Sequence, residues 1–74
     1  MSAILVTFTG DIETLSARQR QCLTLYAKGR LAKQIAGDIG IAQKTVEYHL
    51  EAVRTKLGLS LVQAVVQAAK AGWV

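Results

Sequence analysis

The chain lacks the cross-links that very small proteins use for stability. It contains one cysteine, Cys22, and one histidine, His49. A single cysteine excludes an internal disulfide, and no group of cysteine and histidine has the spacing of a structural metal site. A domain of 74 residues buries only about 60% of the surface of its unfolded chain. We therefore expect additional buried surface to come from association with a second chain.

Long apolar runs, prolines and catalytic groupings are also missing. The run of residues 4–8 is too short for a signal-peptide core and has no basic segment before it. No stretch approaches the ~18 apolar residues of a membrane span. No nucleophile constellation and no pair of carboxylates with a base is present. We therefore expect a cytoplasmic, non-enzymatic protein with no membrane, cofactor, metal or small-molecule ligand.

Acidic residues are scarce. Nine lysines and arginines face five aspartates and glutamates, which gives a net charge of +4. Such a balance suits an anionic partner such as nucleic acid, but it is a weak signal by itself because many basic clusters are simply solvated.

Residues 1–14 form an N-terminal extension in this interpretation. Residues 3–9 are rich in β-branched and aromatic side chains, and Ile4, Val6 and Phe8 would share one face of a strand. Such a strand could pair with its copy in a partner chain. The alternative is a tail that lies on the helices, and the sequence leaves the choice open.

From residue 15 onward the pattern is helical. Ser16 and Gln19 have the spacing of a capping box, and a first helix follows to about Lys28, where Gly29 can end it. Further helices are predicted over 32–39, from 43 to 57, and from about 60 to 71. The third carries an apolar stripe at helical spacing, formed by Val46, Leu50, Val53 and Leu57.

Three small or branched residues lie where the second and third predicted helices meet. Ala36 permits close approach of two helices, Gly40 permits a backbone conformation that a Cβ penalises, and Val46 fills the crossing. Their intervals match a helix-turn-helix, whose second helix enters the major groove of DNA.

On these residues the chain resembles a known family. Residues 15–58 carry Leu-Ser-Ala-Arg-Gln near their start, then Gln-Ile-Ala-Gly-Asp-Ile-Gly-Ile, and finally Thr-Val-Glu-Tyr-His-Leu with Lys-Leu-Gly. They resemble the DNA-binding domain of the LuxR/FixJ/GerE-type regulators of bacteria and phage. The resemblance implies an all-α, four-helix domain over 15–74, in which the third helix reads double-stranded DNA and the fourth dimerises.

The same resemblance points to side chains that contact DNA. It implies that Glu47, Tyr48 and Glu51 face base edges, and that Lys33, Thr45 and His49 contact phosphates or support such contacts. Helical periodicity independently turns Gln43 and Lys44 outward, and Lys44 lies near the positive end of the helix dipole. The expected DNA-binding residues are Lys33, Gln43, Lys44, Thr45, Glu47, Tyr48, His49 and Glu51.

Some positions depart from the family pattern. Glu47 stands where lysine is common, and Leu31 and Ala42 stand where a serine usually caps a helix. A missing cap costs about 1 kcal/mol, and two acids on the reading face repel phosphates although a carboxylate can accept from cytosine N4.

The last predicted helix is polar only at Gln63, Gln67 and Lys70. So narrow a polar stripe indicates burial on more than one side, one of them against a second subunit. The expected homodimer contacts are Leu61, Val62, Val65, Ala68 and Ala69. A twofold dimer predicts inverted DNA half-sites roughly 10 base pairs apart, or a multiple of that. The alternative is a monomer whose last helix is covered by residues 3–9.

These observations favour a dimeric, sequence-specific DNA-binding regulator of transcription. The alternative function is an interaction module that forms mixed dimers with a larger regulator, or inhibits it, without reading DNA. The acids of the reading face and the missing caps support that alternative.

Overall fold

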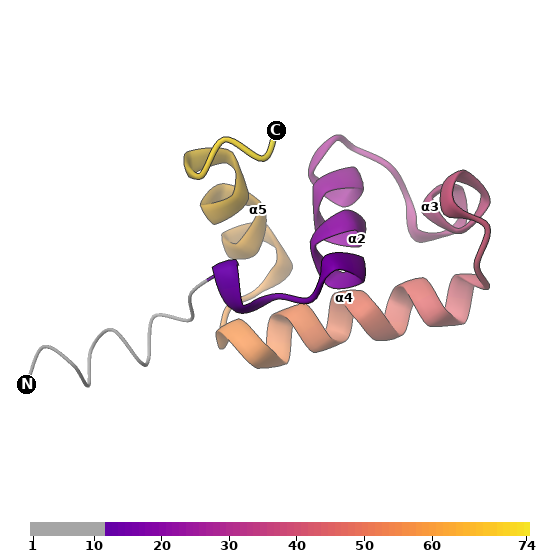
Figure 1. The fold of residues 1–74 in the computed structure, drawn as a ribbon, viewed down its shortest axis with the longest axis horizontal. Coiled ribbons are helices and arrows are strands. Elements are labelled where there is room, and N and C mark those ends of the chain that lie inside the picture. The colour runs from indigo at the N-terminus through magenta and orange to yellow at the C-terminus, as the bar shows by residue number, and fades with distance from the viewer. Residues whose placement is uncertain (1–11) are drawn as a thin grey trace, which may run out of the picture.

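A computed structural model describes residues 12–74 of the chain, so the strand expected over residues 3–9 lies outside the described part. A short 3-10 helix, η1 (Ile12–Thr14), precedes four α-helices. These are α2 (Ala17–Ala27), α3 (Ala32–Ile39), α4 (Gln43–Leu57) and α5 (Leu61–Lys70). The four α-helices confirm the predicted fold class. In Figure 1, α4 runs along one edge of the domain, with α2 crossing it between α3 and α5.

The ends of the helices follow from local chemistry. Ser16 and Ser60 each form a complete capping box, with Gln19 and Gln63 respectively. Leu31 and Ala42, at the starts of α3 and α4, make no side-chain cap hydrogen bond, as the sequence predicts. The other half of a capping box is still present at α3, because Gln34 Oε1 accepts from the Leu31 N–H at 2.9 Å.

The core consists of two clusters that share α4. The α5 cluster contains Ile12, Leu23, Val53, Leu57, Ala64 and Ala68. The helix-turn-helix cluster contains Cys22, Ile35, Ala36, Val46 and Leu50. Because α4 contributes side chains to both clusters, it fixes the position of α3 relative to α5.

The folded domain begins earlier than the sequence analysis assumed. Ile12 is buried in the α5 cluster, and Lys56 Nζ donates to the Thr14 carbonyl at 2.6 Å. Residues 12–14, which were assigned to the extension, therefore belong to the packed domain. A single apolar residue after Gly10-Asp11 gave no periodic signal from which this could be foreseen.

The C-terminal residues fold back onto the domain. Trp73 packs against the α5 cluster, and the Arg20 guanidinium carbon lies 4.1 Å from the centre of the Trp73 ring. This is a cation–π contact between α2 and the chain end. Within residues 12–74, every helix is too short or too polar to cross a bilayer.

Candidate nucleic-acid interface

The α3–turn–α4 unit has the geometry that its three signature residues predict. Ala36 and Val46 are both buried in the helix-turn-helix cluster. Gly40 adopts the left-handed conformation, with φ of 73°, and its N–H donates to the Ala36 carbonyl at 2.9 Å. The turn therefore ends α3 abruptly and sends α4 off in a new direction, as a helix-turn-helix requires.

One side of α4 is exposed along its length. Val46, Leu50 and Val53 face the core, so the side chains about half a helical turn away from them face outward. Tyr48 is 69% exposed, the most of any large apolar side chain on this helix. The other predicted contacts that are exposed are Lys33, Gln43, Lys44, Thr45, Glu47 and Glu51.

His49 is placed differently from the other predicted contacts. It is half-buried, and its Nδ1 is buried without a hydrogen-bond partner. Its ring meets the Tyr48 ring edge-on, with the centroids 5.8 Å apart. A hydrogen bond from this histidine to a phosphate would therefore have to come from Nε2.

Both acids of the α4 face have partners on the same helix. Gln43 Nε2 donates to Glu47 Oε2 at 3.0 Å. Arg54 donates to both oxygens of Glu51, from Nε at 3.2 Å and from Nη2 at 2.5 Å. These hydrogen bonds, together with the Arg54 charge, lower the pKa of Glu51. Arg54 was not among the predicted site residues, although opposite charges three residues apart on a helix are close enough to pair.

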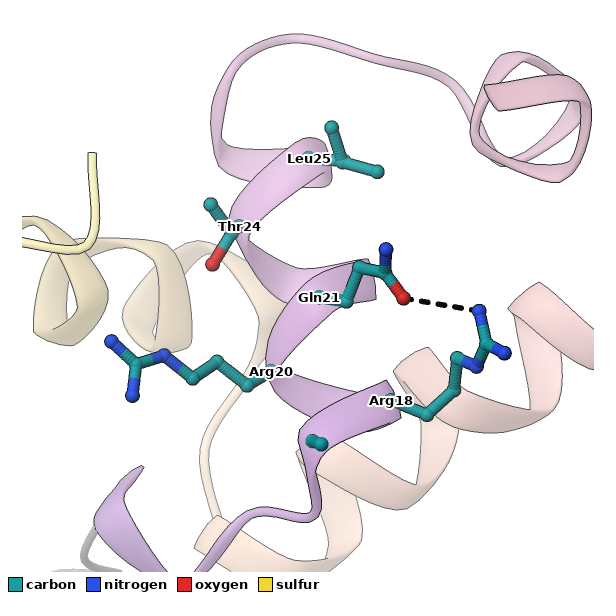
Figure 2. A pocket seen from close by; sticks show the side chains of 6 residues that line it. Arg18, Arg20, Gln21, Thr24 and Leu25 are labelled. Carbon is teal, nitrogen blue, oxygen red and sulfur yellow. Dashed lines mark hydrogen bonds between the residues drawn. The ribbon is translucent and has the colours of Figure 1, made fainter. Parts of the chain in front are cut away.

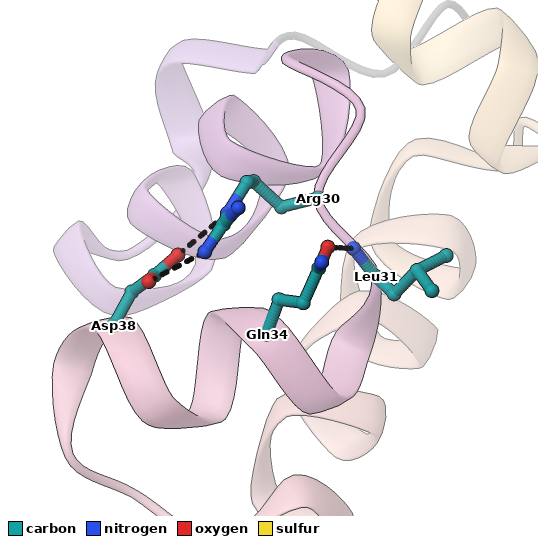
Figure 3. Close-up of polar contacts among 4 residues, drawn as sticks. All are labelled: Arg30, Leu31, Gln34 and Asp38. Atoms are coloured by element: carbon teal, nitrogen blue, oxygen red, sulfur yellow. Dashed lines mark hydrogen bonds and ion pairs between the residues drawn. The ribbon is translucent and has the colours of Figure 1, made fainter.

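A second ion pair fixes α3. Arg30, in the connection from α2, donates from Nε and Nη2 to the two oxygens of Asp38 at 2.9 and 2.8 Å. Figure 3 shows Arg30 spanning from this connection to Asp38, near the end of α3. The hydrogen bonds to Arg30 lower the pKa of Asp38. The connection and the far end of α3 are thereby tied together, which orients the helix that carries Lys33.

The arginines of α2 are engaged elsewhere. Figure 2 shows Arg18 and Arg20 leaving α2 on opposite sides. Arg18 Nη1 donates to Gln21 Oε1 at 3.0 Å, and Arg20 stacks on Trp73. With Ala17, Thr24 and Leu25 these residues line a groove of about 660 Å³ on the outer side of α2.

The predicted dimer contacts on α5 fall into three groups. Val62 and Ala69 are exposed, and Leu61 and Val65 are half-buried against the core. Ala68 is fully buried within its own chain, so its prediction as a partner contact is wrong. The small side chains of Ala64 and Ala68 serve close packing inside the domain. Val66, which was not predicted as a contact, is 45% exposed.

Metal binding and cysteine reactivity receive no support from the described part of the chain. Residues 12–74 contain no group of three His, Cys, Asp or Glu side chains that could hold a metal ion. Cys22 is buried in the helix-turn-helix cluster, and burial raises the pKa of its thiol. A structural thiol fits this environment.

Comparison with known proteins adds a family. The family model GerE, which describes bacterial regulatory proteins of the luxR family, matches residues 13–69. The chain is 45% identical over 49 residues to the "Probable transcriptional regulatory protein SgaR" of Hyphomicrobium methylovorum, covering 66% of this chain and 23% of that protein. It is 34% identical over 61 residues to the "Transcriptional activator protein AhyR" of Aeromonas hydrophila, covering 81% and 24% respectively.

A further match is the "Putative HTH-type transcriptional regulator YhjB" of Escherichia coli (strain K12), 43% identical over 47 residues, 64% of this chain and 24% of that protein. The matched segments span about a quarter of the length of these relatives. No solved structure gave a significant match.

Proposed function

Because this chain belongs to the luxR family of bacterial regulatory proteins, we propose that it binds double-stranded DNA sequence-specifically and regulates transcription. The observation that carries the proposal is the outward face of α4. It is held at a steep crossing by Ala36, Gly40 and Val46, and it presents polar and aromatic side chains along its exposed side. A helix presented in this way is suited to the major groove.

The phosphate contacts come from the starts of α3 and α4. Lys33 and Lys44 lie in the first turns of these helices, where neither Leu31 nor Ala42 supplies a side-chain cap. Without a cap, first-turn N–H groups of α4 remain available for a phosphate, and the helix dipole favours the negative charge. Thr45 and the Nε2 of His49 complete the set.

Base reading falls to Glu47, Tyr48 and Glu51. A carboxylate accepts from cytosine N4 in the major groove, and the Tyr48 ring offers an apolar surface for a thymine methyl group. Gln43 holds the Glu47 carboxylate by a hydrogen bond. Arg54 pairs with the Glu51 carboxylate, and its positive charge offsets the repulsion between that carboxylate and the DNA backbone. This pairing weakens the argument for a module that pairs with a larger regulator without reading DNA.

The chain acts as a homodimer through the exposed side of α5. Val62, Val66 and Ala69 are exposed there, and Leu61 and Val65 border them. An apolar surface of this kind on a small protein marks an interaction site. A twofold contact would place the two α4 helices on inverted half-sites roughly 10 base pairs apart.

Selection from a randomised duplex library tests the proposal. Near physiological salt, the protein should enrich an inverted repeat, and Tyr48→Ala should lose part of each half-site. Lys28→Ala is the control. Lys28 is exposed at the end of α2, so this substitution removes one positive charge without changing α4. Retention that is weak, abolished by salt and free of any enriched sequence would overturn DNA reading.

A further inference from the structure

Leu31 is an unusual residue for its position. It is the N-cap of α3, with extended backbone angles, and makes no side-chain cap hydrogen bond. Serine, threonine, asparagine or aspartate would accept a hydrogen bond from the first turn at such a site. Leucine gives up that bond and leaves its side chain 66% exposed. Both the missing cap and the exposed apolar surface disfavour this residue in an isolated chain.

A groove lies directly beside Leu31. It has a volume of about 390 Å³ and is lined by Tyr26, Gly29, Arg30, Leu31, Val62, Val65 and Val66. Leu31, Val62 and Val66 are 66%, 72% and 45% exposed and are among the most exposed large apolar side chains of residues 12–74. The apolar surface thus continues from α5 to the start of α3, across two elements that are far apart in sequence.

The one charged residue that lines this groove has its guanidinium paired with a carboxylate. Arg30 is held by both oxygens of Asp38, and Figure 3 shows the Arg30 and Leu31 side chains leaving the chain in opposite directions. Because the Arg30 guanidinium is already paired, the groove presents mainly apolar side chains, which suit an apolar occupant.

We infer that this groove receives a second copy of the chain, so that Leu31 packs against α5 of the partner. The inference rests on the proposed dimer and extends its interface beyond the last helix. A twofold contact is self-complementary, so each copy must offer both the groove and the part that fills it. The exposed edge of α5, formed by Val62, Val66 and Ala69, has the apolar character that the groove accepts.

The size of α5 supports this extension. The helix has ten residues and is therefore about 15 Å long. Its inner side is already used, because Ala64 and Ala68 are buried within the chain. A stable dimer buries about 800 Å² per partner, more than one edge of so short a helix can supply. The groove with Leu31 and Tyr26 widens the available surface on the same side of the domain.

A matched pair of cap substitutions tests the inference. Leu31→Ser and Ala42→Ser each restore a capping hydroxyl, one at the groove and one at the start of α4. Measured where the protein is monomeric, each should raise the unfolding midpoint by about 4–8 °C. In sedimentation equilibrium, Leu31→Ser should weaken the dimer by about tenfold or more, because an apolar contact is lost. Ala42→Ser should leave dimerisation unchanged.

The outcomes separate this inference from the proposed dimer. If the wild-type chain dimerises and Leu31→Ser dimerises equally well, the groove is not part of the interface, although the dimer stands. A wild-type chain that stays monomeric at all concentrations overturns both proposals.

A photocrosslinker at position 31 gives an independent measurement that does not depend on the serine variant. We expect a covalent dimer with its crosslink on α5 of the second copy. A crosslink within one chain, to residues 1–11, would show that the chain's own N-terminus fills the groove and would overturn the inference.

Discussion

Lys44 is exposed in the first turn of α4, a turn that contains no acidic residue. Replacing it with alanine should weaken binding to all duplexes by a similar factor, because a phosphate contact carries no sequence information. The slope of log affinity against log salt concentration should become shallower by about 0.9. Lys28→Ala, which removes the same charge just after α2, should leave the slope nearly unchanged. An unaltered slope in Lys44→Ala would remove this lysine from the interface.

The Glu51–Arg54 pair should affect sequence preference more than general affinity. Arg54 holds both carboxylate oxygens of Glu51, so Arg54→Met frees the carboxylate to move. If Glu51 reads a C·G pair, Glu51→Gln should lower discrimination at that base pair by about 1–3 kcal/mol. Arg54→Met should lose part of the same discrimination, and the double variant should lose no more than Glu51→Gln. Binding to matched and mismatched duplexes measures this, and fully additive losses would show that the two side chains act separately.

Individual side chains were the least predictable part of the candidate site. Periodicity correctly turned Lys44, Tyr48 and Glu51 outward, because the opposite stripe of α4 is so regularly apolar. It did not indicate the enclosure of His49 Nδ1. It also did not suggest that Arg54 partners Glu51, because many exposed charges at this spacing remain solvated.

Among the elements, the turn between α3 and α4 depends on Gly40. Its φ of 73° is unfavourable for side chains, yet a Cβ there would meet nothing within 4 Å. Gly40→Ala should therefore destabilise the fold by about 1 kcal/mol through backbone strain alone. Gly37→Ala provides the control, because Gly37 lies inside α3 without a positive φ and with equally open surroundings. It should stabilise by about 0.5–1 kcal/mol. Chemical denaturation measures both changes in unfolding free energy. Changes of the same sign would contradict the assignment of the Gly40→Ala effect to backbone strain.

The connection between α2 and α3 carries a pH-dependent contact. Because Arg30 lowers the pKa of Asp38, this carboxylate contributes stability above its unfolded pKa of about 3.9 and loses it as the pH falls through the lower folded value. The wild-type protein should therefore exceed Asp38→Asn in unfolding free energy near neutral pH, and the difference should shrink in acid. Both groups are partly exposed, so the difference will be small. A difference independent of pH would contradict the pair's role.

Helix boundaries were well predicted where capping chemistry was explicit. Ser16 with Gln19, and the glycines at 40 and 58, set ends that agree with the structure to within a residue or two. η1 was missed because three residues contain no periodicity, and Ile12 is recognisable as a core residue only once α5 lies beside it.

For the molecule as a whole, stability and association should be linked. A second copy that binds only the folded chain raises the unfolding midpoint as protein concentration rises. Val62→Glu should remove that dependence, because Val62 is 72% exposed and a charge there disrupts an apolar interface without disturbing the core. Thermal unfolding over a wide concentration range measures the effect. A midpoint independent of concentration in the wild-type protein, across a range where it dimerises, would contradict the linkage.

The architecture was predictable from sequence because α4 carries a regular apolar stripe, capping residues mark the starts of α2 and α5, and the turn has its three signature residues. The use of each side of α5 was not predictable. Alanines suit close contact equally well within a chain or between chains, and only the structure shows that Ala64 and Ala68 are buried within the domain.

The position of the single thiol has one more consequence. Cys22 is fully buried between α2 and the helix-turn-helix, and the α5 cluster holds no cysteine. A thiol reagent in solution can reach it only when the packing of that half of the domain opens. The rate at which such a reagent modifies Cys22 in the wild-type protein therefore reports how often the packing around the helix-turn-helix opens.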